Sequence, residues 1–335
     1  MACPVPLAVS LGDPAGVGPE LIAAAWARRE EENLPPFFVV EGLGLLRAAA
    51  KSRGLDLPIA PISDSAEATE VFAKALPVLG SVEHAWNPGH PTHDGALLAL
   101  ASLSWASRLA VSGKADGLVT GPVAKARLAE IGFAQPGQTE FVADACGVPH
   151  HDAVMMLAGP SLRTVPLTIH VALADVPRLL TSDLIVRRGR GVASALARDF
   201  GIESPRLAVC GLNPHAGEDG RFGDEEARII APAIAALQAE GIAVTGPHSA
   251  DTMFAPRERG RFDVALCMYH DQALIPIKAL DFDQGVNVTL GLPIVRTSPD
   301  HGTAFAIAGK NIADPGAMIA AIRMAGACAA RRAGG

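Results

Sequence analysis

Three histidines follow apolar segments that are typical of buried β-strands. The segment "TVPLTIH" ends at His170, "LAVCGLNPH" ends at His215 and "VALCMYH" ends at His270. In a parallel sheet the carboxyl ends of the strands lie at one edge, where ligands collect. Imidazole is a common protein ligand for divalent metals, and three protein ligands leave coordination positions open for a substrate. The pattern predicts a metal site at this edge, although no local zinc-binding motif is present.

Elements that could position these histidines follow from the alternation of short apolar segments with Ala/Leu-rich amphipathic segments. Strands are expected at 6–12, 37–42, 115–122, 165–171, 206–213, 262–270 and 286–298. Helices are expected at 18–32, 43–54, 94–113, 177–201, 224–241 and 314–332. The strands are continuous apolar runs, as in sheets that are covered on both faces. The sequence therefore predicts the α/β class, with a mostly parallel sheet between layers of helices.

Composition limits the kind of partner. The chain has 335 residues, which suffice for one large domain or two lobes, and 49% of them are hydrophobic. A net charge of −7 and an aromatic content of only 4% argue against nucleic-acid binding. Five scattered cysteines without a CxxC pair suit a reducing cytoplasm. We expect neither a membrane span nor a targeting segment, and hence a soluble cytoplasmic protein that acts on small molecules.

Six motifs in a fixed order resemble the 4-hydroxythreonine-4-phosphate dehydrogenase family, NAD-dependent enzymes of vitamin B6 biosynthesis. The motifs are "SLGDPAGVGPE", "TGPVAKARL", "GQTEF", "CGLNPHAGEDG", "MYHDQALIPIK" and "GVNVTLGLPIVRTSPDHGTAFAIAGKNIADP". The resemblance extends from about residue 6 to residue 328. The last three motifs are the most specific, whereas "GDPAGVG" lacks the spacing of a G-x-G-x-x-G fingerprint.

The resemblance implies two lobes around a cleft, each a three-layer α/β/α arrangement similar to isocitrate and isopropylmalate dehydrogenases. Residues 1–140 plus 285–335 would form the first lobe and carry the NAD loop. Residues 141–284 would form the second lobe, with the metal ligands and the interface of a homodimer.

The family's metal ligands correspond to His170, His215 and His270, which would meet around one divalent ion (zinc, magnesium or cobalt) at the subunit interface. Its substrate contacts correspond to Gln138, Thr139, Lys278, Asn287 and Arg296. Lys and Arg supply charge and donors for a phosphate and a carboxylate. Gln138 stands where the family usually has His. Glutamine can bind a substrate but cannot carry a proton near neutral pH, so substrate identity is left open.

The cofactor loop of the family corresponds to "HGTAFAIAGKNIADP", and its glycines allow close backbone approach to NAD. NADP is not excluded. The predicted cofactor contacts are Asp13, His301, Gly302, Thr303, Ala304, Asn311 and Asp314. Helix capping is an equally good explanation for Asp314, which precedes a proline and a predicted helix.

By this resemblance, the enzyme oxidises and decarboxylates 4-phosphooxy-L-threonine to 3-amino-2-oxopropyl phosphate. The metal would lower the pKa of the alcohol and stabilise the enolate. Asp251, Asp271 and Lys125 are candidates for proton transfer or for orienting an imidazole. Their alternative roles are helix capping, turn hydrogen bonds and, for Lys125, a solvated helix start.

Three alternatives remain open at this point. A related dehydrogenase could act on D-threonate or D-erythronate 4-phosphate, or on a cyclic dihydrodiol dicarboxylate. A hydrolase or lyase could use the three histidines without a cofactor, but the 301–315 segment argues against it. A non-catalytic metal-binding scaffold would leave Lys278, Asn287 and Arg296 unexplained.

Overall fold

The protein consists of two compact α/β units, seen in a computed structural model that describes residues 5–334. The first unit extends to His150 and resumes at Leu292–Gly334, and the second contains His151–Gly291. The sequence had predicted the boundaries at 140/141 and 284/285.

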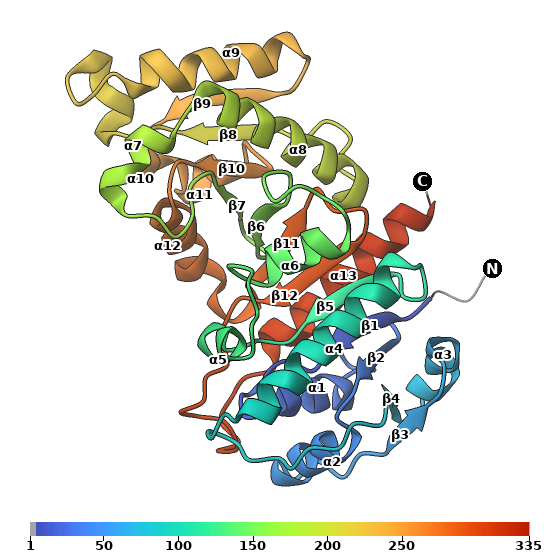
Figure 1. The fold of residues 1–335 in the computed structure, drawn as a ribbon. Helices are drawn as coiled ribbons and strands as arrows, with labels where there is room; N and C mark the ends of the chain where they lie inside the picture. Colours follow the sequence, from blue (N-terminus) through green and yellow to red (C-terminus); the bar gives the residue numbers. More distant parts are fainter. Residues whose placement is uncertain (1–4, 335) are drawn as a thin grey trace. The chain divides into compact units, whose positions relative to one another are not determined.

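The first unit is a parallel sheet flanked by helices (Figure 1, blue to teal, with the C-terminal helix in red). Its strand order is β3-β4-β2-β1-β5-β12, and these neighbours pair in parallel. The strands are β1 (Leu7–Ser10), β2 (Phe37–Val40), β3 (Ile59–Ile62), β4 (Leu76–Leu79), β5 (Gly117–Thr120) and β12 (Val295–Pro299). The helices are α1 (Gly18–Ala27), α2 (Leu43–Ser52), α3 (Ala68–Phe72), α4 (His93–Val111), α5 (Lys125–Glu130), α6 (Gln138–Ala145) and α13 (Gly316–Gly334).

The core of the first unit forms because its strands are apolar on both faces. Phe37 and Phe38 of β2 are fully buried, and the Phe37 ring packs on Phe72 with centroids 5.0 Å apart. Ser102 of α4 is a polar exception inside this core. Its hydroxyl accepts from Leu11 N at 2.9 Å and donates to Val40 O at 2.6 Å. It therefore pairs backbone groups at the ends of two neighbouring strands.

The second unit combines parallel and antiparallel strands (Figure 1, green to orange). In the order β11-β6-β7-β10-β8-β9, β7 to β9 run parallel while β6 pairs antiparallel with both β7 and β11. The strands are β6 (Val154–Ala158), β7 (Arg163–Pro166), β8 (Leu207–Cys210), β9 (Val244–His248), β10 (Val264–Cys267) and β11 (Val286–Leu290). The helices are α7 (Val176–Leu179), α8 (Ser182–Phe200), α9 (Ala231–Ala239), α10 (Ala250–Met253), α11 (Pro256–Arg259) and α12 (His270–Asp281). Because β11 pairs with β6, it belongs to the second unit, and this unit ends at residue 291 instead of the predicted residue 284.

Small side chains allow β8 and β10 of the second unit to lie under tightly packed helices. Ala208, Cys210, Ala265 and Cys267 belong to one buried cluster. The two sulfur atoms, Cys210 Sγ and Cys267 Sγ, are 3.7 Å apart and remain thiols. Both cysteines are fully buried and pack as small apolar residues.

The predicted class, a mostly parallel α/β fold with flanking helices, is confirmed. The expected strand at 165–171 is wrong in extent, because β7 ends at Pro166 and His170 lies in the bend beyond it. The sequence analysis missed strands β3, β4, β6 and β9, of which β3, β4 and β9 contain a proline that disfavours a strand assignment. Helix α12 was missed as well, and it contains Pro276. Within residues 5–334, each helix is too short or too polar to cross a membrane.

Ser102 gives a direct test of this packing. Ser102→Ala leaves Leu11 N and Val40 O unpaired in the core and should lower the free energy of unfolding by about 1–3 kcal/mol. Urea denaturation followed by circular dichroism measures the change. The matched control is Ser104→Ala, two residues along α4, whose hydroxyl contacts only the exposed Arg108. Its effect should stay below about 0.5 kcal/mol. Equal effects of the two substitutions would contradict the structural role of Ser102.

Candidate functional site

Two of the three predicted metal ligands lie side by side in the second unit. The imidazole rings of His170 and His270 have centroids 5.8 Å apart. Two imidazoles that share a tetrahedral zinc ion at about 2 Å have centroids roughly 5 Å apart, so the pair can hold one ion after a small adjustment. Both line a pocket of about 290 Å³. Its lining residues are Thr168, His170, Val171, Leu173, Val176, Tyr269, His270 and Asp271.

Backbone pairing beyond the strand ends brings these two histidines together. Leu167 N donates to Cys267 O at 2.8 Å, and the Thr168 hydroxyl donates to Met268 O at 2.8 Å. These contacts extend the β7–β10 pairing toward the histidines. His170 has φ of 53°, a left-handed conformation that turns the chain sharply after the last contact.

Gln272 is a residue whose role the sequence analysis did not predict. It is buried on α12, where its Oε1 accepts from Met268 N at 2.6 Å and its Nε2 donates to Gly211 O at 2.8 Å. The side chain thereby joins the end of β10, which precedes His270, to the end of β8, which precedes His215. An amide in "YHDQ" directly after a strand was the available sequence signal.

His215 lies in a loop with an unusual backbone. Residues 215–219 all have positive φ, between 41° and 82°. Glu226 holds the start of this loop, because its buried carboxylate accepts from Leu212 N at 2.8 Å and Asn213 N at 2.7 Å. Glu226 was also missed by the sequence analysis. Its carboxylate replaces backbone partners that a left-handed segment cannot supply.

The third imidazole does not complete the site within one chain. His215 is not among the residues that line the pocket of His170 and His270. Across residues 5–334, no group of three or more His, Cys, Asp or Glu side chains is arranged to hold a metal ion. His270 and His170 therefore fit a shared ion, whereas the place of His215 at that ion stays a prediction.

Of the three predicted acid–base candidates, Asp271 and Asp251 lie near histidines of the second unit, whereas Lys125 lies in the first unit. Asp271 Oδ1 contacts His270 Nδ1 at 2.7 Å, which leaves Nε2 of that ring for a ligand. Asp251 in α10 accepts a hydrogen bond from the Ser249 hydroxyl, which lowers its pKa, and the charge of His215 acts in the same direction. Lys125 is the exposed first residue of α5 in the first unit. Its alternative role as a solvated helix start is equally compatible with this position.

A buried guanidinium marks the predicted substrate contacts in the first unit. Arg296 of β12 is 3% exposed, and its Nη2 donates to Thr120 Oγ1 at 2.7 Å and approaches Gln138 Oε1 at 3.5 Å. Burial lowers the pKa of Arg296 to about 10, while the charge of Glu140 partly offsets this effect. Gln138 also donates to Gly121 O at 3.1 Å, and Thr139 follows it at the start of α6. A buried cation of this kind favours binding of an anionic group.

The other two predicted substrate contacts belong to the second unit. Lys278 lies on α12, with its ammonium 6.0 Å from the centre of the Phe282 ring. Asn287 lies on β11 opposite Leu157, and its buried Oδ1 has no hydrogen-bond partner among residues 5–334. An acceptor without a protein partner is suited to a donor group of a ligand.

The predicted cofactor segment, 301–315, is an irregular loop packed on the first helix of the first unit. Val17 N donates to Thr303 O at 2.9 Å, and a Cβ on Gly16 would lie only 2.8 Å from the same oxygen. Ala304 and Asn311 have positive φ, and His301 Nδ1 contacts Gly302 O at 2.9 Å. The loop thus packs on the start of α1 in an irregular backbone conformation that includes two left-handed residues.

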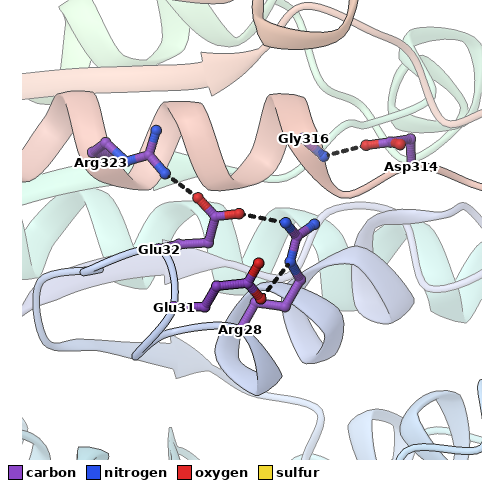
Figure 2. A network of polar contacts seen from close by, with 6 residues as sticks. All are labelled: Arg28, Glu31, Glu32, Asp314, Gly316 and Arg323. Carbon is purple, nitrogen blue, oxygen red and sulfur yellow. Dashed lines mark hydrogen bonds and ion pairs between the residues drawn. The ribbon is translucent and has the colours of Figure 1, made fainter.

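The two predicted acidic cofactor contacts have local hydrogen bonds. Asp314 Oδ1 accepts from Gly316 N at 2.6 Å, at the start of α13 (Figure 2). The capping role that was considered for Asp314 is therefore present. Asp13 is buried and accepts from Ala15 N at 3.0 Å, and burial raises the pKa of its carboxyl group.

Comparison with known proteins gives one consistent family. Residues 33–325 match the model of the family described as "Pyridoxal phosphate biosynthetic protein PdxA". A 4-hydroxythreonine-4-phosphate dehydrogenase of Erythrobacter litoralis is 65% identical over 328 residues, covering 98% of this chain and 98% of the relative. One of Zymomonas mobilis is 54% identical, covering 96% of this chain and 94% of the relative.

Solved structures agree with these matches. A 4-hydroxythreonine-4-phosphate dehydrogenase from Klebsiella pneumoniae has a TM-score of 0.86 at 36% identity, covering 97% of this chain and 99% of that one. A terephthalate 1,2-cis-dihydrodioldehydrogenase from Burkholderia xenovorans LB400 has a TM-score of 0.64 at 30% identity, covering 96% of this chain and 97% of that one.

Substitution of Gln272 tests whether this side chain positions the predicted metal ligands. Gln272→Leu keeps the volume but leaves Met268 N and Gly211 O unpaired, so the free energy of unfolding should fall by about 1–3 kcal/mol. Zinc affinity should fall about 10- to 100-fold, as for other residues that orient metal ligands. Zinc titration by calorimetry and urea denaturation measure the two effects. Unchanged zinc affinity in a destabilised Gln272→Leu protein would limit Gln272 to a structural role.

Proposed function

Because this chain belongs to the PdxA family of pyridoxal phosphate biosynthetic proteins, we propose that it oxidises and decarboxylates 4-phosphooxy-L-threonine with NAD and a divalent metal. The chain is an oxidoreductase of pyridoxal phosphate biosynthesis. The observation that carries this conclusion is high identity over nearly the whole chain to 4-hydroxythreonine-4-phosphate dehydrogenases. The product would be 3-amino-2-oxopropyl phosphate.

His170, His270 and His215 would hold the divalent metal. The first two are supported by the 5.8 Å separation of their rings in one pocket. When bound, the metal supplies a Lewis acid that lowers the pKa of the substrate alcohol and polarises the ketone formed by oxidation. The Asp271 carboxylate would orient His270 by accepting from Nδ1, which leaves Nε2 for the ion. Asp251, whose charge interacts with that of His215, would orient this imidazole or accept a proton.

Positive charge and unused hydrogen-bonding groups would select the substrate. Arg296 supplies a buried cation, and Gln138 and Thr139 beside it supply neutral hydrogen-bonding groups. Lys278 and Asn287 would contact the phosphate and a donor group of the substrate. Gln138 would act only in binding, because an amide does not exchange protons near neutral pH.

The 301–315 loop would hold the nicotinamide cofactor. Its positive-φ residues Ala304 and Asn311 and the glycine contact at Gly16 support close approach of the backbone to a dinucleotide. We assign NAD as the cofactor and leave NADP as an outcome of the assay. His301 Nε2, which has no protein partner in the described chain, would bind the cofactor directly.

A homodimer would complete the metal site. Large apolar side chains surround the histidines although they face solvent: Val171 is 41%, Leu173 66% and Phe222 49% exposed. The Phe222 ring lies 6.3 Å from the His215 ring, and Leu173 lines the pocket of His170 and His270. Exposed apolar groups of this kind are typical of subunit interfaces. The five scattered cysteines, which include no CxxC pair, support a reducing cytoplasm as the location.

A second candidate substrate is a cyclic dihydrodiol dicarboxylate. It is favoured by Gln138 and by the likeness to the terephthalate dihydrodiol dehydrogenase structure. The buried Arg296 would bind a carboxylate as readily as it binds a phosphate. D-Threonate and D-erythronate 4-phosphates are further substrates to test.

The assay that tests the proposal follows the absorbance of reduced nicotinamide. We expect turnover with 4-phosphooxy-L-threonine and NAD, loss of turnover with a chelator, and recovery when zinc, magnesium or cobalt is added. The same assay with D-threonate 4-phosphate, D-erythronate 4-phosphate or a dihydrodiol dicarboxylate distinguishes the alternatives. A higher kcat/KM for any of these three would replace the proposed substrate.

His215→Ala tests the third metal ligand. Turnover should fall by at least about 100-fold, because loss of metal removes several kcal/mol of charge stabilisation. The mass of the dimer in light scattering and the affinity for NAD should stay close to wild type. The control is His248→Ala, a histidine of β9 that contacts only the Thr245 hydroxyl in the hydrogen bonds of residues 5–334. A fully active His215→Ala protein with bound metal would rule out this ligand.

Leu173→Asp tests the subunit interface. A carboxylate buried against a second apolar surface is costly, so light scattering should show a monomer at concentrations where the wild type is a dimer. Zinc affinity should fall at the same time if the ion is shared between subunits. Leu97→Asp, at a 46% exposed leucine of the first unit, is the matched control and should leave the mass unchanged. A dimeric Leu173→Asp protein would place the interface elsewhere.

A further inference from the structure

A buried carboxylate lies beneath the 301–315 loop. Glu20, in the first turn of α1, is only 1% exposed. Neither of its carboxylate oxygens has a hydrogen-bond partner within residues 5–334. Burial raises the pKa of Glu20, whereas the charge of Arg53 favours its ionised form. Burial of a carboxylate without hydrogen-bond partners costs free energy. We therefore expect this side chain to act on a neighbouring charged group.

Arg53 connects this carboxylate to the loop. It directly follows α2, and its side chain is 13% exposed. Its Nη1 lies 4.0 Å from Glu20 Oε2 and donates to Ala313 O at 3.0 Å. One guanidinium therefore contacts both the carboxylate of α1 and a backbone carbonyl of the loop. Through this contact the pair Glu20–Arg53 acts on the loop at Ala313.

The backbone hydrogen bonds within this part of the loop are local. The bonds Ile307 N to Ala304 O and Lys310 N to Ile307 O are local turns that can move with the loop. Val17 N holds the loop at Thr303, which is six residues before Gly309. Pro88 packs against Gly309, since a Cβ at that glycine would lie 2.6 Å from Pro88 Cγ. Pro88 and Arg53 therefore contact the two ends of segment 309–313.

We propose that Glu20 and Arg53 are positioning residues that fix segment 309–313 in the conformation that binds the dinucleotide. The proposal rests on the proposed function for its cofactor. Neither side chain needs to touch the cofactor, because Arg53 acts through the backbone carbonyl of Ala313 and Glu20 acts through Arg53. Removing the charge of Glu20 leaves Arg53 buried without a counter-charge, and the segment then samples other conformations. Binding of the cofactor must select the correct one, which weakens its apparent affinity.

Two substitutions test the pair in the full-length protein. Glu20→Gln keeps the shape and removes the charge, and Arg53→Met keeps the apolar stem and removes the donors. In either variant, hydrogen exchange of the amides at 309–313 should be at least tenfold faster than in wild type. The Kd for NAD, measured by calorimetry, should rise at least tenfold. The kcat at saturating NAD should stay within threefold, because the reacting groups are unchanged. Arg53→Lys should restore part of the affinity.

Arg323→Met is the matched control. Arg323 of α13 pairs with Glu32, just beyond α1, in a surface network that also contains Arg28 (Figure 2). This ion pair joins neighbouring elements of the same unit but contacts no residue of 309–313 in the figure or in the described hydrogen bonds. Its removal should change neither the exchange of the loop nor the affinity for NAD.

The outcomes separate this proposal from the cofactor assignment. Wild-type exchange rates at 309–313 in both folded variants would overturn the positioning role. If Glu20→Gln unfolds, the charge-free double variant Glu20→Gln/Arg53→Met, which buries no lone charge, decides the question by the same exchange measurement. If the wild type binds neither NAD nor NADP, the proposed cofactor is wrong. The exchange rates need no cofactor and still decide whether the pair positions the loop.

Discussion

Parallel pairing of β10 with β7 on one side and β8 on the other is the constraint on which the candidate metal site depends. It carries the three histidine-bearing segments to one edge of the second unit. Small side chains in β8 and β10, and the buried amide of Gln272, let these strand ends approach closely. Metal binding at His170 and His270 then requires only that the chain turn toward the pocket after each strand.

Buried polar groups set the shape of both units at their functional segments. Glu226 supplies acceptors for the left-handed loop of His215, and Ser102 pairs the ends of β1 and β2. Arg296 and Glu20 are charges that the core does not need for stability, since buried ions gain little over apolar residues of the same size. The proposed roles, an anionic ligand for Arg296 and the cofactor loop for Glu20, would explain these buried charges.

The structure also distinguishes predicted residues that form hydrogen bonds within the chain from those with a polar atom left for a ligand. Asp314 caps the start of α13, and Asp13 caps a turn, so part of their hydrogen-bonding capacity is used within the chain. Asn287 Oδ1 and His301 Nε2 have no such partner in the described residues and are better placed to bind a small molecule. A list of motif residues does not contain this distinction, because it depends on which backbone groups lie nearby.

The sequence by itself determined the α/β class, most strands, the helices α1, α2, α4, α8, α9 and α13, and the family, because apolar periodicity and six ordered motifs are local properties of the chain. It also predicted that His170, His215 and His270 follow strands, although β7 ends earlier than expected. Only the tertiary structure revealed Gln272, Glu226 and the Glu20–Arg53 pair, since each acts on residues distant in the chain. Strands β3 and β4 likewise needed it, because neighbouring strands stabilise segments whose prolines disfavour them locally.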